Sequence, residues 1–373
     1  MLKRNNNSLG YFYVYFVIQI IFILVHSYLP IYFKNVIFVD KRTLIFTWII
    51  SYSFLLVKPA ISLYYNKRIG NFRIILITSS IGVILSFFLI ILTLELLLIF
   101  GLFLGINFAF SSILDVIVDK TLVENSDSEK SKNKNAASLQ FGAALGSLIP
   151  PFFYLITPSW SIYFSGVFII TIPLIFIVFF MNTSVEIQNK EEIKTINSNK
   201  IIGKKLKLMC LFTFLIYADK LYEIPLEPWI TNIVDISIFS IFLIILIIIN
   251  TLGILIAGIV SHKYDKKKIL MICCLGTGIL MMIISFSNIY VIFILFSIIQ
   301  VFAGFMLINL ISLMIDTSKK QVLYYQIIAF FSILAKLIFV PLGDYLSLFI
   351  PVETIMFISG IPFVISTFVV YYI

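Results

Sequence analysis

Long apolar runs separated by short polar turns recur along the whole of this 373-residue chain. A helix needs about 20 apolar residues to cross the ~30 Å hydrocarbon core of a bilayer. The runs that reach this length are 9–33, 43–65, 73–93, 96–119, 137–157, 161–181, 208–231, 237–261, 268–287, 289–315, 322–346 and 352–373. With 61% apolar and only 12% charged residues, the chain has too little polar surface for a soluble protein. The pattern predicts an all-α polytopic membrane protein with about twelve transmembrane helices.

The basic residues between the runs give an independent check on this number of spans. With the N-terminus in the cytoplasm, 21 Lys and Arg residues fall in the cytoplasmic segments and three, Lys34, Lys41 and Arg42, fall on the opposite side. Cytoplasmic loops of membrane proteins carry such an excess of Lys and Arg, and one span missed in the middle would destroy the bias. We therefore expect a multi-pass protein of the cell membrane with both termini in the cytoplasm.

The longest interruption of the apolar pattern is a stretch rich in Lys, Glu, Asn and Ser at 182–207. Its composition is typical of a solvated linker. It predicts an N-terminal six-helix bundle at 1–181, a cytoplasmic linker at 182–207 and a C-terminal six-helix bundle at 208–373.

Two short basic turns occupy matching places after the second and the eighth run. The first turn carries Lys67, Arg68, Gly70 and Arg73, and the second carries Gly258, Lys263 and Asp265. This six-plus-six arrangement resembles the major facilitator superfamily, whose loops after spans two and eight follow a pattern close to G-x-L-a-D-R-x-G-R-K. Lys67 and His262 stand where that pattern has Asp. The resemblance implies two six-helix bundles and a gating role for the loop residues just named.

A finer resemblance concerns the fourth and seventh runs. Asp115, Asp119 and Glu124 are similar to the D-x-x-x-D-x-x-x-x-E of the muropeptide-permease and acetyl-CoA-transporter branch of that family, as is the segment 217–221. The aromatic–basic pair that this branch has in span five is absent here. The branch stays one hypothesis among others.

Charged residues inside the runs are candidates for a functional site, because each costs at least about 2.5 kcal/mol at bilayer depth. They are Lys58, Asp115, Asp219, Lys220, Glu223, Glu227, Lys336 and Asp344. Asp219, Glu223 and Glu227 are four residues apart and share one flank of a helix. Pro225 and Pro228 remove backbone donors and indicate a break in the outer half of this seventh span. Whether Glu223 and Glu227 lie inside or outside the membrane stays open.

Several roles are open to these residues. Burial disfavours the charged form of a carboxylate, so that Asp219, assisted by Glu223, can serve as a proton switch. His26 is a candidate proton shuttle and also a candidate packing residue. Lys336 either neutralises an acidic partner or meets an anionic substrate.

Polar residues also gather in the runs that, in the family this chain resembles, line a central cavity. The resemblance implies substrate binding by Gln19, Asn107, Gln300, Asn309 and Lys336, and proton coupling by Asp219, Glu223, His26 and Asp115.

Other classes of protein lack support in the sequence. There is no P-loop for ATP, no His/Cys cluster with metal-ligand spacing and no nucleophile–base pair, so we expect neither an enzyme nor a cofactor. The basic residues lie in short loops without a continuous basic face, which argues against nucleic acid. The expected function is secondary active transport of a small polar, anionic or zwitterionic organic solute, coupled to protons, by a monomer in the lipid bilayer.

Two alternatives to solute transport remain. A lipid or amphiphile flippase is compatible with the 38 Phe residues and the few polar side chains in the runs. A membrane sensor that reuses the fold would bind a ligand without flux.

Overall fold

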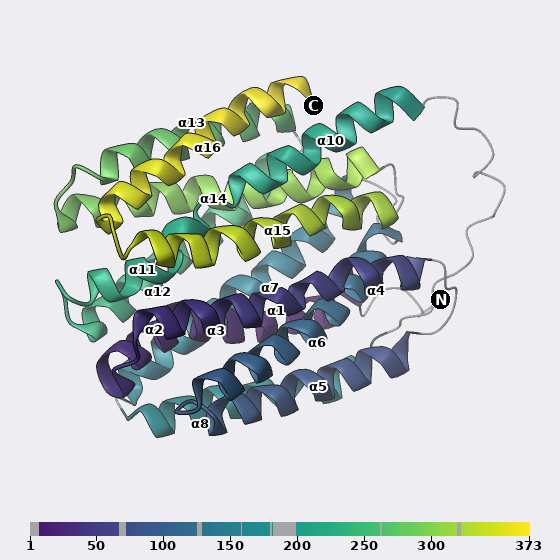
Figure 1. The fold of residues 1–373 in the computed structure, drawn as a ribbon. Coiled ribbons are helices and arrows are strands. Elements are labelled where there is room, and N and C mark those ends of the chain that lie inside the picture. The colour runs from purple at the N-terminus through teal and green to yellow at the C-terminus, as the bar shows by residue number, and fades with distance from the viewer. Residues whose placement is uncertain are drawn as a thin grey trace.

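The computed structural model of the chain is a bundle of helices whose long axes run in similar directions (Figure 1). It describes residues 7–66, 72–124, 129–157, 159–179, 181, 199–261, 263–318 and 322–373, and this part of the chain contains no strand. The elements are α1 (Asn7–Ile23), η1 (Leu24–Tyr28), α2 (Leu29–Tyr32), η2 (Phe33–Ile37), α3 (Lys41–Ser53), η3 (Phe54–Leu56), α4 (Val57–Asn66), α5 (Arg73–Leu92), α6 (Leu97–Glu124), α7 (Glu129–Ile156), α8 (Trp160–Thr171), α9 (Leu174–Phe179), α10 (Asn199–Ile216), α11 (Lys220–Ile230), α12 (Ile236–Val260), α13 (Lys266–Ile284), α14 (Ile289–Ser318), α15 (Val322–Leu346) and α16 (Val352–Tyr372).

Eleven helical stretches of the described residues are long and apolar enough to cross a membrane. The predicted seventh span is not among them, because a turn at 217–219 divides it into α10 and α11. With this divided span the number is twelve. The prediction of an all-α membrane protein with about twelve spans is confirmed.

The outer surface of the bundle is rich in large apolar side chains. Ile74, Phe176, Ile259, Phe286 and Phe368 are all exposed. A soluble monomer rarely exposes apolar surface on this scale, whereas lipid tails solvate it well. The exposed residues therefore form the lipid-facing surface, and the polar residues turn inward.

The two halves of the chain pack against each other mainly through α7 and α15. Helix α7 contacts α12 and α14, and α15 contacts α3, α4 and α6. Within the first half, α1 lies directly on α7 at two glycines. A Cβ at Gly142 or Gly146 would stand 2.1 Å or 2.2 Å from the carbonyl oxygen of Phe12 or Phe16, so only glycine permits this approach.

The start of α1 and the end of α16 lie toward the same end of the bundle, on the right in Figure 1. We call this the inner end and the opposite one the outer end. The assignment of the inner end to the cytoplasm stays a prediction. The division at 182–207 also stays a prediction, since 182–198 lie outside the described residues and α10 already begins at Asn199.

Four of the spans depart from regular α-helix in their interior. The first contains the π-helical turn η1, the second contains the 3₁₀ turn η3, the sixth is interrupted at 172–173 between α8 and α9, and the seventh contains the break at 217–219. Irregular backbone at membrane depth is tolerated only where protein buries it or where it lines a cavity. A site is therefore to be sought where such departures line a cavity.

Candidate functional site

A cavity of about 630 Å³ lies between the two halves. Helices α1, α4, α6, α10, α11, α14 and α15 all contribute to its wall. Its charged lining residues are Lys58, Asp115, Asp119, Asp219, Lys220, Glu223, Glu227 and Lys336. Most of the ionisable residues that the sequence places in the spans are thus brought to one place.

The break in the seventh span presents its charged residues to this cavity. The backbone tightens there to bonds between residues three apart, from Leu221 N to Ala218 O (3.1 Å) and from Tyr222 N to Asp219 O (3.3 Å). The break precedes Pro225 and Pro228, which lie inside α11, so the expectation of a break at the prolines is wrong. The carbonyl of Leu221 has no donor four residues on, because that residue is Pro225. Helix α15 packs against this carbonyl at Gly343, whose Cβ would stand 1.6 Å from it.

Lys220 joins two carboxylates at the break into what we call the α11 cluster. Its Nζ lies 2.6 Å from Glu223 Oε1 and 3.4 Å from Asp219 Oδ2. Asp219 Oδ1 and Glu223 Oε2 are buried and accept no hydrogen bond from the described residues. Two carboxylates thus share one ammonium, and each has one oxygen without a hydrogen-bond partner.

His26 stands beside this cluster, on η1. Its Nε2 lies 4.0 Å from Glu223 Oε2 and hydrogen-bonds the Tyr52 hydroxyl, while its Nδ1 lies 2.7 Å from Phe22 O. The imidazole stacks on Phe22 with 3.8 Å between ring centroids. The ring is buried behind the cavity wall, so His26 contacts the α11 cluster without lining the cavity.

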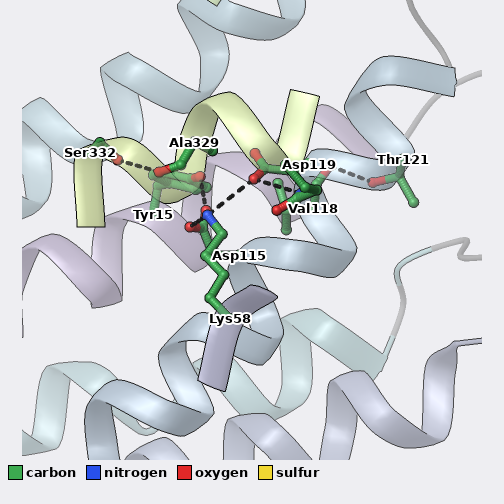
Figure 2. Close-up of polar contacts among 9 residues, drawn as sticks. Tyr15, Lys58, Asp115, Val118, Asp119, Thr121, Ala329 and Ser332 are labelled. Atoms are coloured by element: carbon green, nitrogen blue, oxygen red, sulfur yellow. Dashed lines mark hydrogen bonds and ion pairs between the residues drawn. The ribbon is translucent and has the colours of Figure 1, made fainter. Parts of the chain in front are cut away.

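A second group of charges, the α6 cluster, surrounds Lys58. Figure 2 shows its Nζ between Asp115 and Asp119, which α6 presents one turn apart. The Nζ lies 3.3 Å from Asp119 Oδ2 and also pairs with Asp115, which accepts from the Tyr15 hydroxyl. Gln326 of α15 donates to Asp119 Oδ2 at 3.0 Å. The cluster therefore links α4 and α6 of the first half to the second half.

Lys336 of α15 differs from the other two intramembrane lysines. Its ammonium lies over the rings of Phe22 (4.8 Å to the centroid) and Tyr217 (5.7 Å). Among the residues that the structure describes, no carboxylate lies within 4.0 Å of it. Cation–π contacts of this kind hold a cation in place without neutralising it. Lys336 therefore offers the cavity an uncompensated positive charge.

The structure places some of the neutral residues predicted to bind substrate at the cavity and others elsewhere. Gln19 and Gln300 line the cavity. Asn107 is also in the wall, but its amide donates to Val83 O (2.8 Å) and Ser86 Oγ (3.0 Å). Asn309 lies outside the lining and donates to Ser261 Oγ at 2.9 Å, which makes it a packing residue and not part of the site.

The predicted gating residues lie at helix ends, away from the cavity. Arg73 begins α5 and donates to Phe179 O at 2.5 Å. Asp265 caps α13 by accepting from Lys267 N at 2.9 Å, and Lys263 lies in the preceding turn. Gly258 has open space around it. Lys67, Arg68 and Gly70 lie outside the described residues.

Among the charged residues that line the cavity, Lys58, Asp119, Lys220 and Glu227 were not predicted to bind substrate or couple protons, and neither was Tyr15. For Glu227 a signal existed in the sequence, because it continues the spacing of Asp219 and Glu223. The structure brings its side chain to the Ser27 hydroxyl of the first half, at 3.3 Å from Oγ to Oε1. In the part of the chain that the structure describes, no three His, Cys, Asp or Glu residues are placed to hold a metal ion.

Comparison with known proteins agrees with this architecture. A sequence model of the Major Facilitator Superfamily matches residues 208–373. The fold is similar to that of the human organic anion transporter MFSD10 (TETRAN), with a TM-score of 0.70, 11% identity and 97% of each chain covered. It is also similar to the transporter FucP in its outward conformation, with a TM-score of 0.68 and 13% identity over 98% of this chain and 97% of that one. Among curated proteins, none matches this sequence.

Proposed function

We propose that the chain is a membrane transporter of the major facilitator superfamily and that it carries a small organic anion or zwitterion by alternating access. It acts as a carrier and not as an enzyme. Within the proposal it works as a monomer in the cell membrane and draws on the proton gradient. That the chain is related to the muropeptide-permease and acetyl-CoA-transporter branch stays a hypothesis, because these matches do not test it.

The observation that carries the proposal is the uncompensated ammonium of Lys336. Lys58 and Lys220 are each held by two carboxylates, whereas Lys336 meets only aromatic rings. A cation without a counter-charge in a water-poor cavity attracts an anionic group strongly. The cavity of about 630 Å³ is of the size that holds a small molecule. The name of MFSD10, an organic anion transporter, points to the same class of substrate.

Two further features support coupled transport. The cavity lies between two halves that are joined at its rim by single polar contacts, such as Gln326 with Asp119, which can break and re-form. The seventh span supplies carboxylates at cavity depth, and a carboxylate that changes its protonation state on each side of the membrane couples solute to proton flow. We place the coupling group among these carboxylates.

The direct test is uptake into proteoliposomes that contain the purified protein. The vesicles receive a mixture of carboxylates, amino acids, sugars and amines, with and without an imposed pH gradient, and the trapped solutes are identified by mass spectrometry. We expect anionic or zwitterionic solutes to accumulate, and to do so only with the gradient. Accumulation of neutral or cationic solutes alone, or movement of labelled lipid in its place, would contradict the proposal.

A further inference from the structure

Glu227 is set apart from the other acidic residues of the cavity by its lack of a cation. Asp219 and Glu223 share Lys220, and Asp115 and Asp119 share Lys58. Glu227 is 6% exposed, and no Lys, Arg or His of the described residues lies within 4.0 Å of its carboxylate. Its Oε1 accepts one bond, from Ser27 Oγ at 3.3 Å, and its Oε2 is buried without a partner. A carboxylate in this setting is stable only if something neutralises it.

The single bond that Glu227 does receive comes from the other half of the molecule. Ser27 lies on η1 of the first half, and Glu227 lies on α11 of the second. Two more contacts join the halves nearby: Tyr28 OH to Ser240 Oγ (2.8 Å) and Lys34 Nζ to Asn232 Oδ1 (2.6 Å). We call this set of contacts the outer seam. It lies toward the outer end of the bundle, where α2 and α11 meet in Figure 1.

Prolines on α11 leave two carbonyl oxygens of the same helix without their usual donors. Pro228 has no N–H to give to Ile224 O, and Pro225 has none to give to Leu221 O. Carboxylate, hydroxyl and freed carbonyl oxygens are the groups with which transporters hold a coupling proton or sodium ion. The Glu227 carboxylate, with an Oε2 that lacks a partner, and the Ser27 hydroxyl come together at the outer seam.

We infer that Glu227 is the binding site of the coupling cation, a proton or Na⁺, and that its occupancy controls the outer seam. This rests on the proposed function and deepens it by naming the site. With the cation bound, the carboxylate is neutral and the seam closes around it. When the cation leaves, the charged carboxylate needs water, and the two halves part at this end. The Asp219–Lys220–Glu223 group, already paired, keeps its charges throughout.

The charged and titratable groups near Glu227 bear on any pH test. Lys220, Tyr222 and Glu223 on α11 and Tyr28 on η1 interact with it electrostatically, and Lys34 of η2 contacts the next residue of α11, Pro228. The elements packed against α11 also carry His26 on η1, Tyr32 on α2, Lys336 and Asp344 on α15, and Glu353 on α16. Of these groups, Glu223 is the most similar to Glu227 in its side chain and the closest to it in sequence. A substitution of Glu223 therefore separates a response of Glu227 from a response of its neighbours.

The test measures opening of the outer seam with a thiol reporter. A second cavity, of about 310 Å³, is lined at this end by residues of both halves, including Leu44, Ile224 and Pro228. Leu44 is only 8% exposed, so Leu44→Cys reacts with a membrane-impermeant maleimide only when the seam opens. The native residues Cys210, Cys273 and Cys274 are buried. Phe286→Cys, at an exposed position of the outer end, corrects for the effect of pH on the thiol itself.

We expect labelling of Leu44→Cys to be slow at mildly acidic pH and several-fold faster at mildly alkaline pH. Adding Glu227→Gln, which imitates the neutral carboxyl, should keep labelling slow at both. Glu223→Gln and Asp219→Asn, as matched controls, should retain the response. At alkaline pH, slowing by NaCl but not by choline chloride identifies sodium as the cation, and equal rates in the two salts identify the proton.

A pH or sodium response that survives in Glu227→Gln would overturn the inference, and its simultaneous loss in Glu223→Gln would assign it to Glu223. Glu227→Asp, which keeps a carboxylate, should restore the response and guards against a folding defect in the Gln variant. Gradient-driven uptake that is undiminished in Glu227→Gln contradicts the inference and leaves the proposed function standing. A Glu227-dependent response in protein that accumulates no solute contradicts the proposed function alone.

Discussion

The α6 cluster and the α11 cluster contain the same kinds of charge and use them in opposite ways. In the α6 cluster one ammonium, one phenol and one amide serve two carboxylates, and neither Asp115 nor Asp119 has a buried oxygen without a partner. In the α11 cluster and beside it, Asp219, Glu223 and Glu227 each have a buried carboxylate oxygen without a hydrogen-bond partner. The carboxylates of the α6 cluster are thus satisfied, although Gln326 Oε1 beside them lacks a partner, and those of the α11 cluster are not.

The difference indicates a division of labour. A fully satisfied buried network fixes the helices that supply it, whereas a partly satisfied one is costly unless a ligand completes it. The α6 cluster therefore holds α4, α6 and α15 in one arrangement. The α11 cluster, Lys336 and Glu227 carry the groups that a solute or a cation would satisfy.

The largest expected effect comes from breaking the complete cluster. Lys58→Met leaves the buried Asp119 and the partly buried Asp115 without their cation, and loss of one partner of a buried pair costs about 3–5 kcal/mol. We expect a much lower unfolding temperature in detergent. A thiol-reactive dye can follow it, since all three cysteines are buried. Adding Asp115→Asn and Asp119→Asn should recover much of the loss. An unchanged unfolding temperature would show that the cluster does not hold the helices.

An intermediate effect, on transport and not on stability, is expected at the incomplete site. Lys336→Met removes the uncompensated ammonium, and loss of one charged contact to the solute costs about 1.5–3 kcal/mol, or roughly ten- to a hundredfold in affinity. Uptake should fall by that factor while the unfolding temperature stays the same or rises. Lys205→Met, the same change at an exposed position of α10, is the control. A large fall in stability would mean that Lys336 is a structural residue like Lys58.

The smallest effect is expected where the complete cluster crosses between the halves. Gln326→Leu removes the bond to Asp119 Oδ2, but Lys58 remains at 3.3 Å, so we expect a loss of about 1 kcal/mol. Because this bond lies between the halves, the variant should also change how fast they part. Labelling of Leu44→Cys in the Gln326→Leu background would report this. If neither the stability nor the labelling rate changed, the α6 cluster would contribute to the first half alone and not to the contact between the halves.

Much of the fold could be predicted from the sequence, because few kinds of backbone structure are stable in a bilayer. Run length and loop charge predicted twelve spans. The matching turns indicated the resemblance to the major facilitator superfamily. These inferences rest on local periodicity and need no knowledge of which helices touch.

The composition of the site was less accessible, because it depends on contacts between distant spans. Nothing local to Lys58 indicates that it meets Asp115 and Asp119, 57 and 61 residues away. The same holds for Ser27 and Glu227, which are 200 residues apart. The break in the seventh span was expected at the prolines and falls before them, which brings Glu227 inside the bundle. Asn309 had the right residue type in the right span and faces Ser261.

The π-helical turn η1 also carries information about how the first span came to have its shape. Such a turn is an α-helix with one residue too many, and the surplus residue is accommodated between Leu24 and Tyr28. Deleting a residue before this turn, where regular helix cannot absorb the change, would rotate everything beyond it by about 100°, the angle of one residue. Lys34 would then point away from Asn232, and Ser27 from Glu227. The length of this span in residues is thus part of its specificity, as much as the side chains it carries.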